Sequence, residues 1–292
     1  MVDQRVRYNQ SEGKEGAFLV AVNYCGGLPF GKAENYPIWC GMYDQMGAAG
    51  ILNCGATVNK YVDVDVEGDM PSTCQSEFLV MVTCTDKENK RVYDAGYGLK
   101  HIDLGSPGEW VYSTHSSAID AYSLFRGTSA ATPIVAGAVG LLYSYPCKAW
   151  SDLQKSNPAE AVRIAKRALL AGVDKNNDLT GLTVSGGRFN IRTSLDSLNK
   201  LICNLTFDDD FRILSLYPNP AQTNLQVQLN TKQSGIYFVE IIDAMGRKLF
   251  SQENQFIASQ FDLSLPSLTD GIYILRLTRD LNHASKKFII RN

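Results

Sequence analysis

The stretch GTSAATPIVAGAVGLLYS, residues 127–144, joins a cluster of small residues to a long apolar run. Small side chains let the backbone pass close to a bound molecule, and the apolar run predicts a buried helix beginning at Thr128 or Ser129. Such a helix start directs unpaired N–H groups toward anything bound there. Pro133 is expected in the first turn, where no helical hydrogen bond needs its missing N–H. On local physics alone, a nucleophilic Ser129 and an ordinary helix cap are equal alternatives.

The string GTSAATP followed by VAGAVGLL resembles the nucleophile segment of the subtilisin-like serine proteases, the subtilases. The resemblance covers about residues 16–202 and is closest to subtilases of bacteria that use type IX secretion. It implies that Ser129 is the catalytic nucleophile and that Gly127 and Thr128 contact the substrate. Members of this family carry their triad in the chain order Asp, His, Ser.

Two earlier segments agree with the subtilase order. GAFLVAVN, residues 16–23, is an apolar run that predicts a buried parallel strand. Cys25, Gly26 and Gly27 follow where subtilases pair with the substrate backbone, so the resemblance implies substrate binding there. Apolar residues at helical spacing then predict a helix in YPIWCGMYDQMGAAG, residues 36–50.

ILNCGATVN, residues 51–59, predicts a second buried strand that ends at Asn59. The resemblance implies that the Asn59 side chain stabilises the oxyanion of the reaction. Val58 departs from the family, which usually has Gly at this place. An Asn that merely caps a turn is the alternative.

Three later segments also follow the family pattern: MPSTCQSEFLVMVTCTD, AGYGLKHIDLGSPGEWVYST and SGGRFNIRTSLDSL, at residues 70–86, 95–114 and 185–198. The first two are expected to hold strands, and the last the start of a terminal helix.

The acid and base of a subtilase are missing from this sequence. Neither an Asp-Ser/Thr-Gly nor a His-Gly-Thr motif occurs in the 292 residues. His101 is expected in a strand and His283 in a polar hairpin, which leaves His115 as the one histidine that could approach Ser129, in the wrong chain order. A serine hydroxyl needs a base to become a good nucleophile, so Ser129 and Asn59 alone predict a weak catalyst.

We therefore expect the chain to be the C-terminal part of a subtilase, with the Asp, the His and a signal peptide encoded upstream of an internal Met1. MVDQRVRYNQSEGKEG, the first 16 residues, has no apolar core run of a signal peptide. The alternatives are a truncated, inactive pseudo-protease that retains peptide binding, and a surface adhesion or structural protein.

Composition suits a secreted chain of two domains. We expect an α/β domain over residues 1–203, holding a partial subtilisin-like parallel sheet flanked by helices, a linker at 204–212, and a small all-β sandwich at 213–292. The net charge of −2 with no basic stripe gives no support for nucleic-acid binding. No apolar run approaches the ~18 residues of a transmembrane segment.

The seven cysteines all lie in the first domain, which permits disulfides in an oxidising compartment. Cys147 and Cys203 are the expected pair. The odd count leaves at least one thiol free, and the absence of a Cys-x-x-Cys pair argues against zinc.

Two acidic stretches alternate like calcium ligands: Asp63, Asp65, Glu67, Gly68 and Asp69, and then Asp174, Asn176, Asp178 and Gly181. Neither continues to the Glu that an EF-hand requires at the twelfth loop position. We expect solvated loops at both places, and no cofactor.

Beyond Cys203 the helical spacing ends and apolar residues alternate at period two. The alternating residues are Leu225, Val227, Leu229; Tyr237, Val239, Ile241; Phe261, Leu263, Leu265; and Tyr273, Leu275, Leu277. Six or seven short strands in about 80 residues predict a small β-sandwich.

This module resembles the C-terminal sorting domain of type IX secretion substrates. The matching segments are YPNP (217–220), DAMGRK (243–248), GIYILRL (271–277) and KKFIIRN (286–292). The resemblance implies that type IX machinery is a partner through residues 213–292, with a polypeptide as substrate of the first domain. It also implies a secreted or outer-surface protein of a Gram-negative bacterium. An adhesive or spacer β-domain is the alternative.

Overall fold

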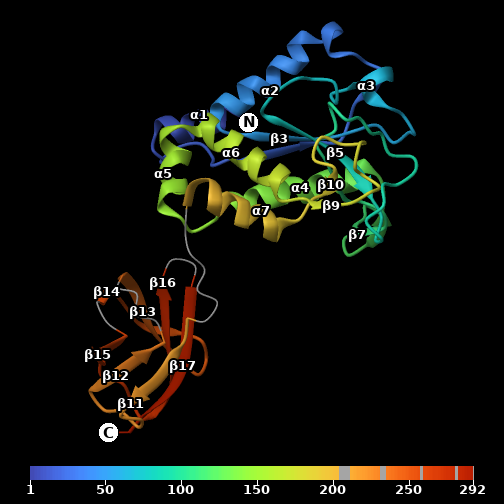
Figure 1. The fold of residues 1–292 in the computed structure, drawn as a ribbon. Coiled ribbons are helices and arrows are strands. Elements are labelled where there is room, and N and C mark those ends of the chain that lie inside the picture. The colour runs from blue at the N-terminus through green and yellow to red at the C-terminus, as the bar shows by residue number, and fades with distance from the viewer. Residues whose placement is uncertain (204–210, 231–234, 257–258, 280–281, 292) are drawn as a thin grey trace. The chain divides into compact units, whose positions relative to one another are not determined.

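The computed structural model describes residues 1–203, 211–230, 235–256, 259–279 and 282–291. The chain divides into two compact units, Met1–Asn204 and Leu205–Asn292. The first unit is α/β and the second all-β (Figure 1). Most of the expected linker at 204–212 lies outside the described residues.

A six-stranded sheet forms the centre of the first unit. Its strands, in spatial order, are β1 (Ala21–Tyr24), β3 (Leu52–Ala56), β5 (Leu79–Thr85), β6 (Leu104–Pro107), β10 (Gly187–Arg188) and β9 (Asp174–Lys175). All neighbours are parallel except β10 and β9. Every residue of β3 and β5 is buried, as expected for central strands covered on both faces.

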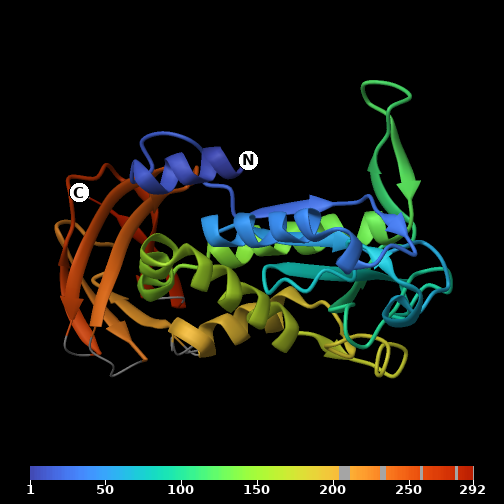
Figure 2. The same cartoon turned by 90° about the horizontal axis from the view of Figure 1, so that it is seen from above.

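Helices lie around this sheet, and several of them pack directly against it (Figures 1 and 2). They are α1 (Val2–Gln10), α2 (Pro37–Ala49), α3 (Val64–Glu67), α4 (Thr128–Tyr143), α5 (Lys148–Ser156), α6 (Pro158–Ala171) and α7 (Ile191–Leu198), with short turns at Ala33–Asn35 and Asn199–Cys203. Helix α4 packs along β1, β3, β5 and β6, and α2 and α6 pack against β3 and each other. In the described part of the chain no single helix could span a membrane; α4 and α5 reach the required length and apolar content only as a pair, bent by 108°.

Two pairs of short strands lie beside the main sheet. Strand β2 (Leu28–Pro29) pairs with β4 (Asp69–Met70), which brings together segments that are about 40 residues apart. Strands β7 (Val111–Thr114) and β8 (Tyr122–Phe125) form a hairpin that projects from the body of the unit (green in Figure 2).

Three sequence expectations about strands are wrong. The strand expected over 51–59 ends at Ala56, and Asn59 lies in the loop beyond it. Residues 16–23 were expected to form a buried strand, but β1 covers only 21–24 and is half-buried to exposed. It forms the edge of the sheet, since no strand within the described residues pairs with its other side. His101 lies in a turn before β6 rather than in a strand.

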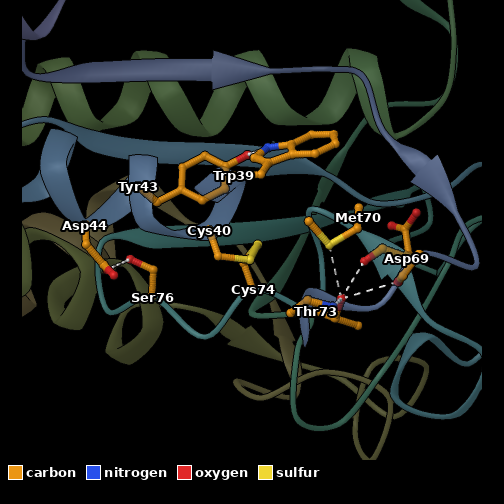
Figure 3. The surroundings of a disulfide bond; sticks show 11 residues. Trp39, Cys40, Tyr43, Asp44, Asp69, Met70, Thr73, Cys74 and Ser76 are labelled. Atoms are coloured by element: carbon orange, nitrogen blue, oxygen red, sulfur yellow. Dashed lines mark hydrogen bonds between the residues drawn. A yellow bond between two sulfur atoms is a disulfide. The ribbon is translucent and has the colours of Figure 1, made fainter. Parts of the chain in front are cut away.

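Two disulfides hold loops of the first unit. Cys40 on α2 is bonded to Cys74, which follows β4 (Figure 3). Cys147 and Cys203 are bonded as expected and join the start of α5 to the turn after α7. The other three cysteines are free: Cys25 is exposed, while burial raises the pKa of both Cys54 and Cys84 to about 12. The two buried thiols are therefore unreactive at neutral pH.

The second unit is a sandwich of two antiparallel sheets. One contains β11 (Ile213–Tyr217), β12 (Asn224–Leu229) and β15 (Gln260–Ser264); the other contains β14 (Lys248–Phe256), β13 (Gly235–Asp243), β16 (Gly271–Arg279) and β17 (Asn282–Ile290). Most of the alternating residues identified in the sequence form one buried core between the sheets, and Phe261 and Leu265 pack partly buried against it. At the β13–β14 turn, Asp243 accepts backbone N–H groups of Met245 and Arg247, both at 2.9 Å, and the bonds with Arg247 lower the pKa of its carboxyl.

The Cys147–Cys203 bond closes a loop of sequence separation 56, so its loss frees much of the unfolded chain. We expect Cys147→Ser with Cys203→Ser to lower the free energy of unfolding of the first unit by about 2–4 kcal/mol. All three tryptophans lie in this unit, so urea unfolding followed by tryptophan fluorescence reports on it alone. Ser116→Ala, at an exposed serine outside both disulfides, is the control and should leave the midpoint unchanged. A different pairing in non-reducing peptide mapping would contradict this account.

Candidate active site

Helix α4 begins at Thr128, one of the two expected starts. Gly127 adopts φ 112° and ψ 179°, a region that is essentially restricted to glycine. Its N–H donates to the Gly108 carbonyl at 2.9 Å, and its own carbonyl accepts the N–H groups of Ala130 and Ala131. The N–H of half-buried Ser129 has no acceptor within the described residues. Ser129 thus presents a hydroxyl and an unpaired N–H at the helix start.

The side chain of Asn59 is oriented by this first turn. The backbone N–H of Thr128 donates to Asn59 Oδ1 at 2.9 Å, and the Thr128 hydroxyl lies 3.0 Å from the same oxygen. A backbone N–H can only donate, so the contacting atom of Asn59 must be its oxygen. Asn59 Nδ2 has no acceptor in the part of the chain that the structure describes, and can donate to a bound oxygen atom.

Crowding explains why a glycine precedes Thr128. A Cβ added at Gly127 would lie 2.9 Å from Asn59 Oδ1 and 3.3 Å from Nδ2. Any larger residue there would displace the Asn59 carboxamide as well as strain the backbone.

A pocket of about 160 Å³ lies beside Ser129. It is lined by Cys25, Gly26, Gly27, Pro29, Ala56, Thr57, Val58, Asn59, Asp69 and Ser129. The fold thus brings together five residues singled out in the sequence from three distant segments. The other two, Gly127 and Thr128, do not line the pocket; Thr128 is fully buried and holds Asn59 instead.

A polar network continues from Thr128 to the far wall of the pocket. The Thr128 hydroxyl donates to Thr57 O at 2.5 Å, and the Thr57 hydroxyl donates to Asp69 Oδ2 at 3.2 Å. Asp69 Oδ2 also accepts the Val58 N–H at 3.1 Å, so the residue that departs from the family pattern helps to hold the carboxylate. Burial raises the pKa of Asp69, and the hydrogen bond from Ser72 works against that rise.

Asp69 was missed as a site residue, because the sequence suggests a solvated acidic loop there. Its side chain is instead buried, at 2% exposure for the residue. The burial depends on the pairing of β4 with β2, for which residues 63–69 alone give no signal.

Pro133 lies inside α4, one turn later than expected. A proline there removes the N–H that would bind the carbonyl four residues earlier, which is that of Ser129. The Cys25 thiol lies 3.5 Å from this carbonyl oxygen and donates to it. The helix continues because the unpaired carbonyl has a partner outside the helix.

None of the three histidines lines the Ser129 pocket. His101 Nδ1 is 2.7 Å from Asp65 Oδ1, and His101 lines a different pocket. His115 bonds to Ser117 in the β7–β8 hairpin, and His283 lies on β17 in the second unit.

Three other acidic residues of the two candidate calcium stretches, Asp63, Asp65 and Asp174, have protein partners. Asp63 caps α3 by accepting the Asp65 N–H at 3.0 Å, and Asp174 contacts Arg188 and Asn190. Within the described residues, no group of three His, Cys, Asp or Glu side chains is arranged to hold a metal ion.

The geometry predicts opposite effects for two glycine substitutions at α4. Gly127→Ala should lower the free energy of unfolding by about 1–3 kcal/mol, because φ 112° is strained for alanine and the new Cβ meets Asn59. Gly137→Ala, in the middle of α4 with open space around the added Cβ, should raise it by about 0.5–1 kcal/mol. Urea unfolding followed by tryptophan fluorescence measures both. Equal effects of the two substitutions would contradict the role given to Gly127.

Comparison with known proteins agrees with this architecture. A model of the subtilase family matches residues 8–178, more than half of the chain, and a model of the secretion system C-terminal sorting domain matches residues 215–291. Thermitase of Thermoactinomyces vulgaris is 40% identical over 65 residues, 22% of this chain and 22% of thermitase. Subtilisin-like protease 2 of Plasmodium falciparum is 30% identical over 102 residues, 35% of this chain and 7% of that protein. The chain therefore spans only a small part of these curated relatives.

Solved structures share the fold of the first unit. Prenylagaramide maturation protease PagA has a TM-score of 0.50 at 21% identity, and the alignment covers 68% of each chain. A mutant of the protease domain of PatA has a TM-score of 0.51 at 17% identity, with 69% of this chain and 66% of that one covered. The chain belongs to the subtilase family and ends in a type IX secretion C-terminal sorting domain.

Proposed function

We propose that this chain is part of a secreted subtilisin-like serine endopeptidase that cleaves polypeptides through Ser129. The observation that supports this best is the orientation of Asn59, which lines the pocket of Ser129: its Oδ1 accepts the Thr128 N–H, while its Nδ2 has no acceptor within the described residues. The Ser129 hydroxyl attacks the scissile carbonyl carbon. The Ser129 N–H and Asn59 Nδ2 donate to the oxyanion that forms.

The reaction also needs a base to take the Ser129 proton and a carboxylate to orient that base. Neither family motif for these groups occurs in the 292 residues, and no histidine lines the pocket. We propose that polypeptide outside these residues supplies both. In subtilisin, loss of the serine or histidine lowers turnover by about 10⁶, whereas the oxyanion hole and binding retain roughly 10³–10⁴ over water. The chain by itself is then close to inactive.

The sorting domain indicates where the proposed protease is exported. We propose that type IX machinery recognises residues 213–292 and carries the protein to the outer surface of a Gram-negative cell or beyond it. The family match at 215–291 supports this proposal.

An inactive relative that retains peptide binding is the second candidate. It is favoured by the absence of the Asp and His motifs, and by Val58 and the Cys25–Gly27 segment, which depart from the family pattern. The two candidates differ in whether Ser129 reacts when an acid and a base are present.

The test uses a chain extended by the coding sequence that precedes Met1. We expect a fluorophosphonate probe to label Ser129 in the extended protein, and Ser129→Ala to abolish both labelling and peptide hydrolysis. Asn59→Ala should lower kcat by about 10²–10³, because one oxyanion donor is lost. Asn177→Ala, at an exposed asparagine that does not line the pocket, is the matched control and should leave kcat unchanged.

Peptide binding without labelling, in an extended protein that contains both missing motifs, would contradict the protease proposal and favour the inactive relative. An upstream reading frame with neither motif would do the same. Hydrolysis that persists in Ser129→Ala would contradict the role of Ser129.

A further inference from the structure

The wall of the Ser129 pocket contains one carboxylate, that of Asp69. Asp69 is the only acidic or basic residue among the ten that line it. The other lining residues are uncharged, and most of them are small or apolar, with Gly26, Gly27 and Ala56 among them. A long side chain entering the pocket would pass these walls and meet the carboxylate.

Asp69 is held rigidly by its backbone. It begins β4, paired with β2 at Pro29, and its carbonyl accepts the Thr73 hydroxyl at 3.0 Å and the Thr73 N–H at 2.9 Å. The neighbouring Cys74 is bonded to Cys40 on α2, so a covalent link anchors this segment (Figure 3). The carboxylate therefore has a fixed position relative to the pocket.

A second wall of the pocket is fixed against the same segment. A Cβ added at Gly27 would lie 2.2 Å from the carbonyl oxygen of Met70, so only glycine fits at this approach. The wall made by Cys25, Gly26 and Gly27 thus stands directly against β4.

The two oxygens of the Asp69 carboxylate differ in their partners. Oδ2 accepts three hydrogen bonds, from the Ser72 hydroxyl at 2.5 Å, the Val58 N–H at 3.1 Å and the Thr57 hydroxyl at 3.2 Å. Oδ1 accepts no hydrogen bond within the described residues. It is also not one of the fully buried side-chain atoms that lack a partner. Oδ1 is therefore the oxygen that Asp69 offers to the pocket.

Asp69 also lacks a counter-charge. No Lys, Arg or His of the described chain forms an ion pair with it, and the groups that favour its charged form are the hydroxyls of Ser72 and Thr57 and the N–H of Val58, all uncharged. A buried carboxylate without a cation is unfavourable, and a cation brought by a ligand relieves that penalty.

We infer that Asp69 makes this pocket select a lysine or arginine side chain of the substrate. The inference rests on the proposed function. In the proposed reaction Asn59 binds the oxygen of the scissile carbonyl and Ser129 attacks its carbon. The adjoining pocket therefore receives the side chain of the residue that contributes this carbonyl. The ammonium or guanidinium binds Oδ1, and the apolar stem lies along Ala56, Val58 and Pro29.

The test compares peptides that differ only at the residue contributing the scissile carbonyl, with Lys, Arg, Gln or Leu there. In the extended protein we expect kcat/KM for Lys or Arg to exceed that for Leu by about 10- to 100-fold. Asp69→Asn keeps the size of the side chain and should lower kcat/KM for the Lys and Arg peptides to the value for the Leu peptide in the same protein. Asp178→Asn, at an exposed aspartate outside the pocket, is the matched control and should leave the preference unchanged.

A second measurement needs no catalysis. N-acetyl-arginine amide should bind the 292-residue chain more tightly than N-acetyl-leucine amide in an NMR titration, and Asp69→Asn should abolish the difference. Equal binding of the two amides overturns the inference. Equal kcat/KM for the Gln and Lys peptides in the extended protein also overturns the inference, since Asp69 would then act as a neutral hydrogen-bonding group.

The two proposals fail differently. Labelling at Ser129 without a basic preference overturns the role of Asp69 and leaves the protease intact. A preference for the arginine amide in a protein that never labels supports the pocket assignment and contradicts the proposed protease.

Discussion

The carboxamide of Asn59 is bound by the first turn of α4, and the whole candidate site depends on that contact. One oxygen faces the N–H and the hydroxyl of Thr128, at 2.9 and 3.0 Å. The contact joins the loop after β3 to the helix that carries Ser129, two segments far apart in the sequence. It also determines which end of the carboxamide faces the pocket, because a backbone N–H accepts nothing.

Several features of the fold serve this contact. Gly127 leaves room for the carboxamide and takes a backbone conformation that other residues avoid. Thr128 is buried and its hydroxyl donates to the carbonyl of Thr57, whose own hydroxyl binds Asp69. The oxyanion donor and the carboxylate of the pocket wall are thus linked through one set of hydrogen bonds. A change at Thr128 or Thr57 would disturb both.

The sequence predicted those parts of the structure that local chemistry determines. The start of α4, the buried strands β3 and β5, and the alternating core of the sandwich follow from apolar spacing. The meeting of Cys25, Asn59 and Ser129 in one pocket followed from a family resemblance.

What the sequence missed depends on contacts between distant segments. Asp69 is buried because β4 pairs with β2 and because three donors from elsewhere converge on one oxygen. Pro133 is tolerated inside α4 because the Cys25 thiol binds the carbonyl that it leaves unpaired. The edge position of β1 follows from the order of strands in the sheet, which apolar content does not reveal.

The most direct measurement is a crystal structure of the extended protein with a phosphonate bound covalently to Ser129. The account predicts a phosphonyl oxygen within hydrogen-bonding distance of both Asn59 Nδ2 and the Ser129 N–H, with Asn59 Oδ1 still bound to Thr128. An adduct whose oxygen points away from Asn59, or an Asn59 carboxamide that leaves Thr128 when the adduct forms, would contradict it.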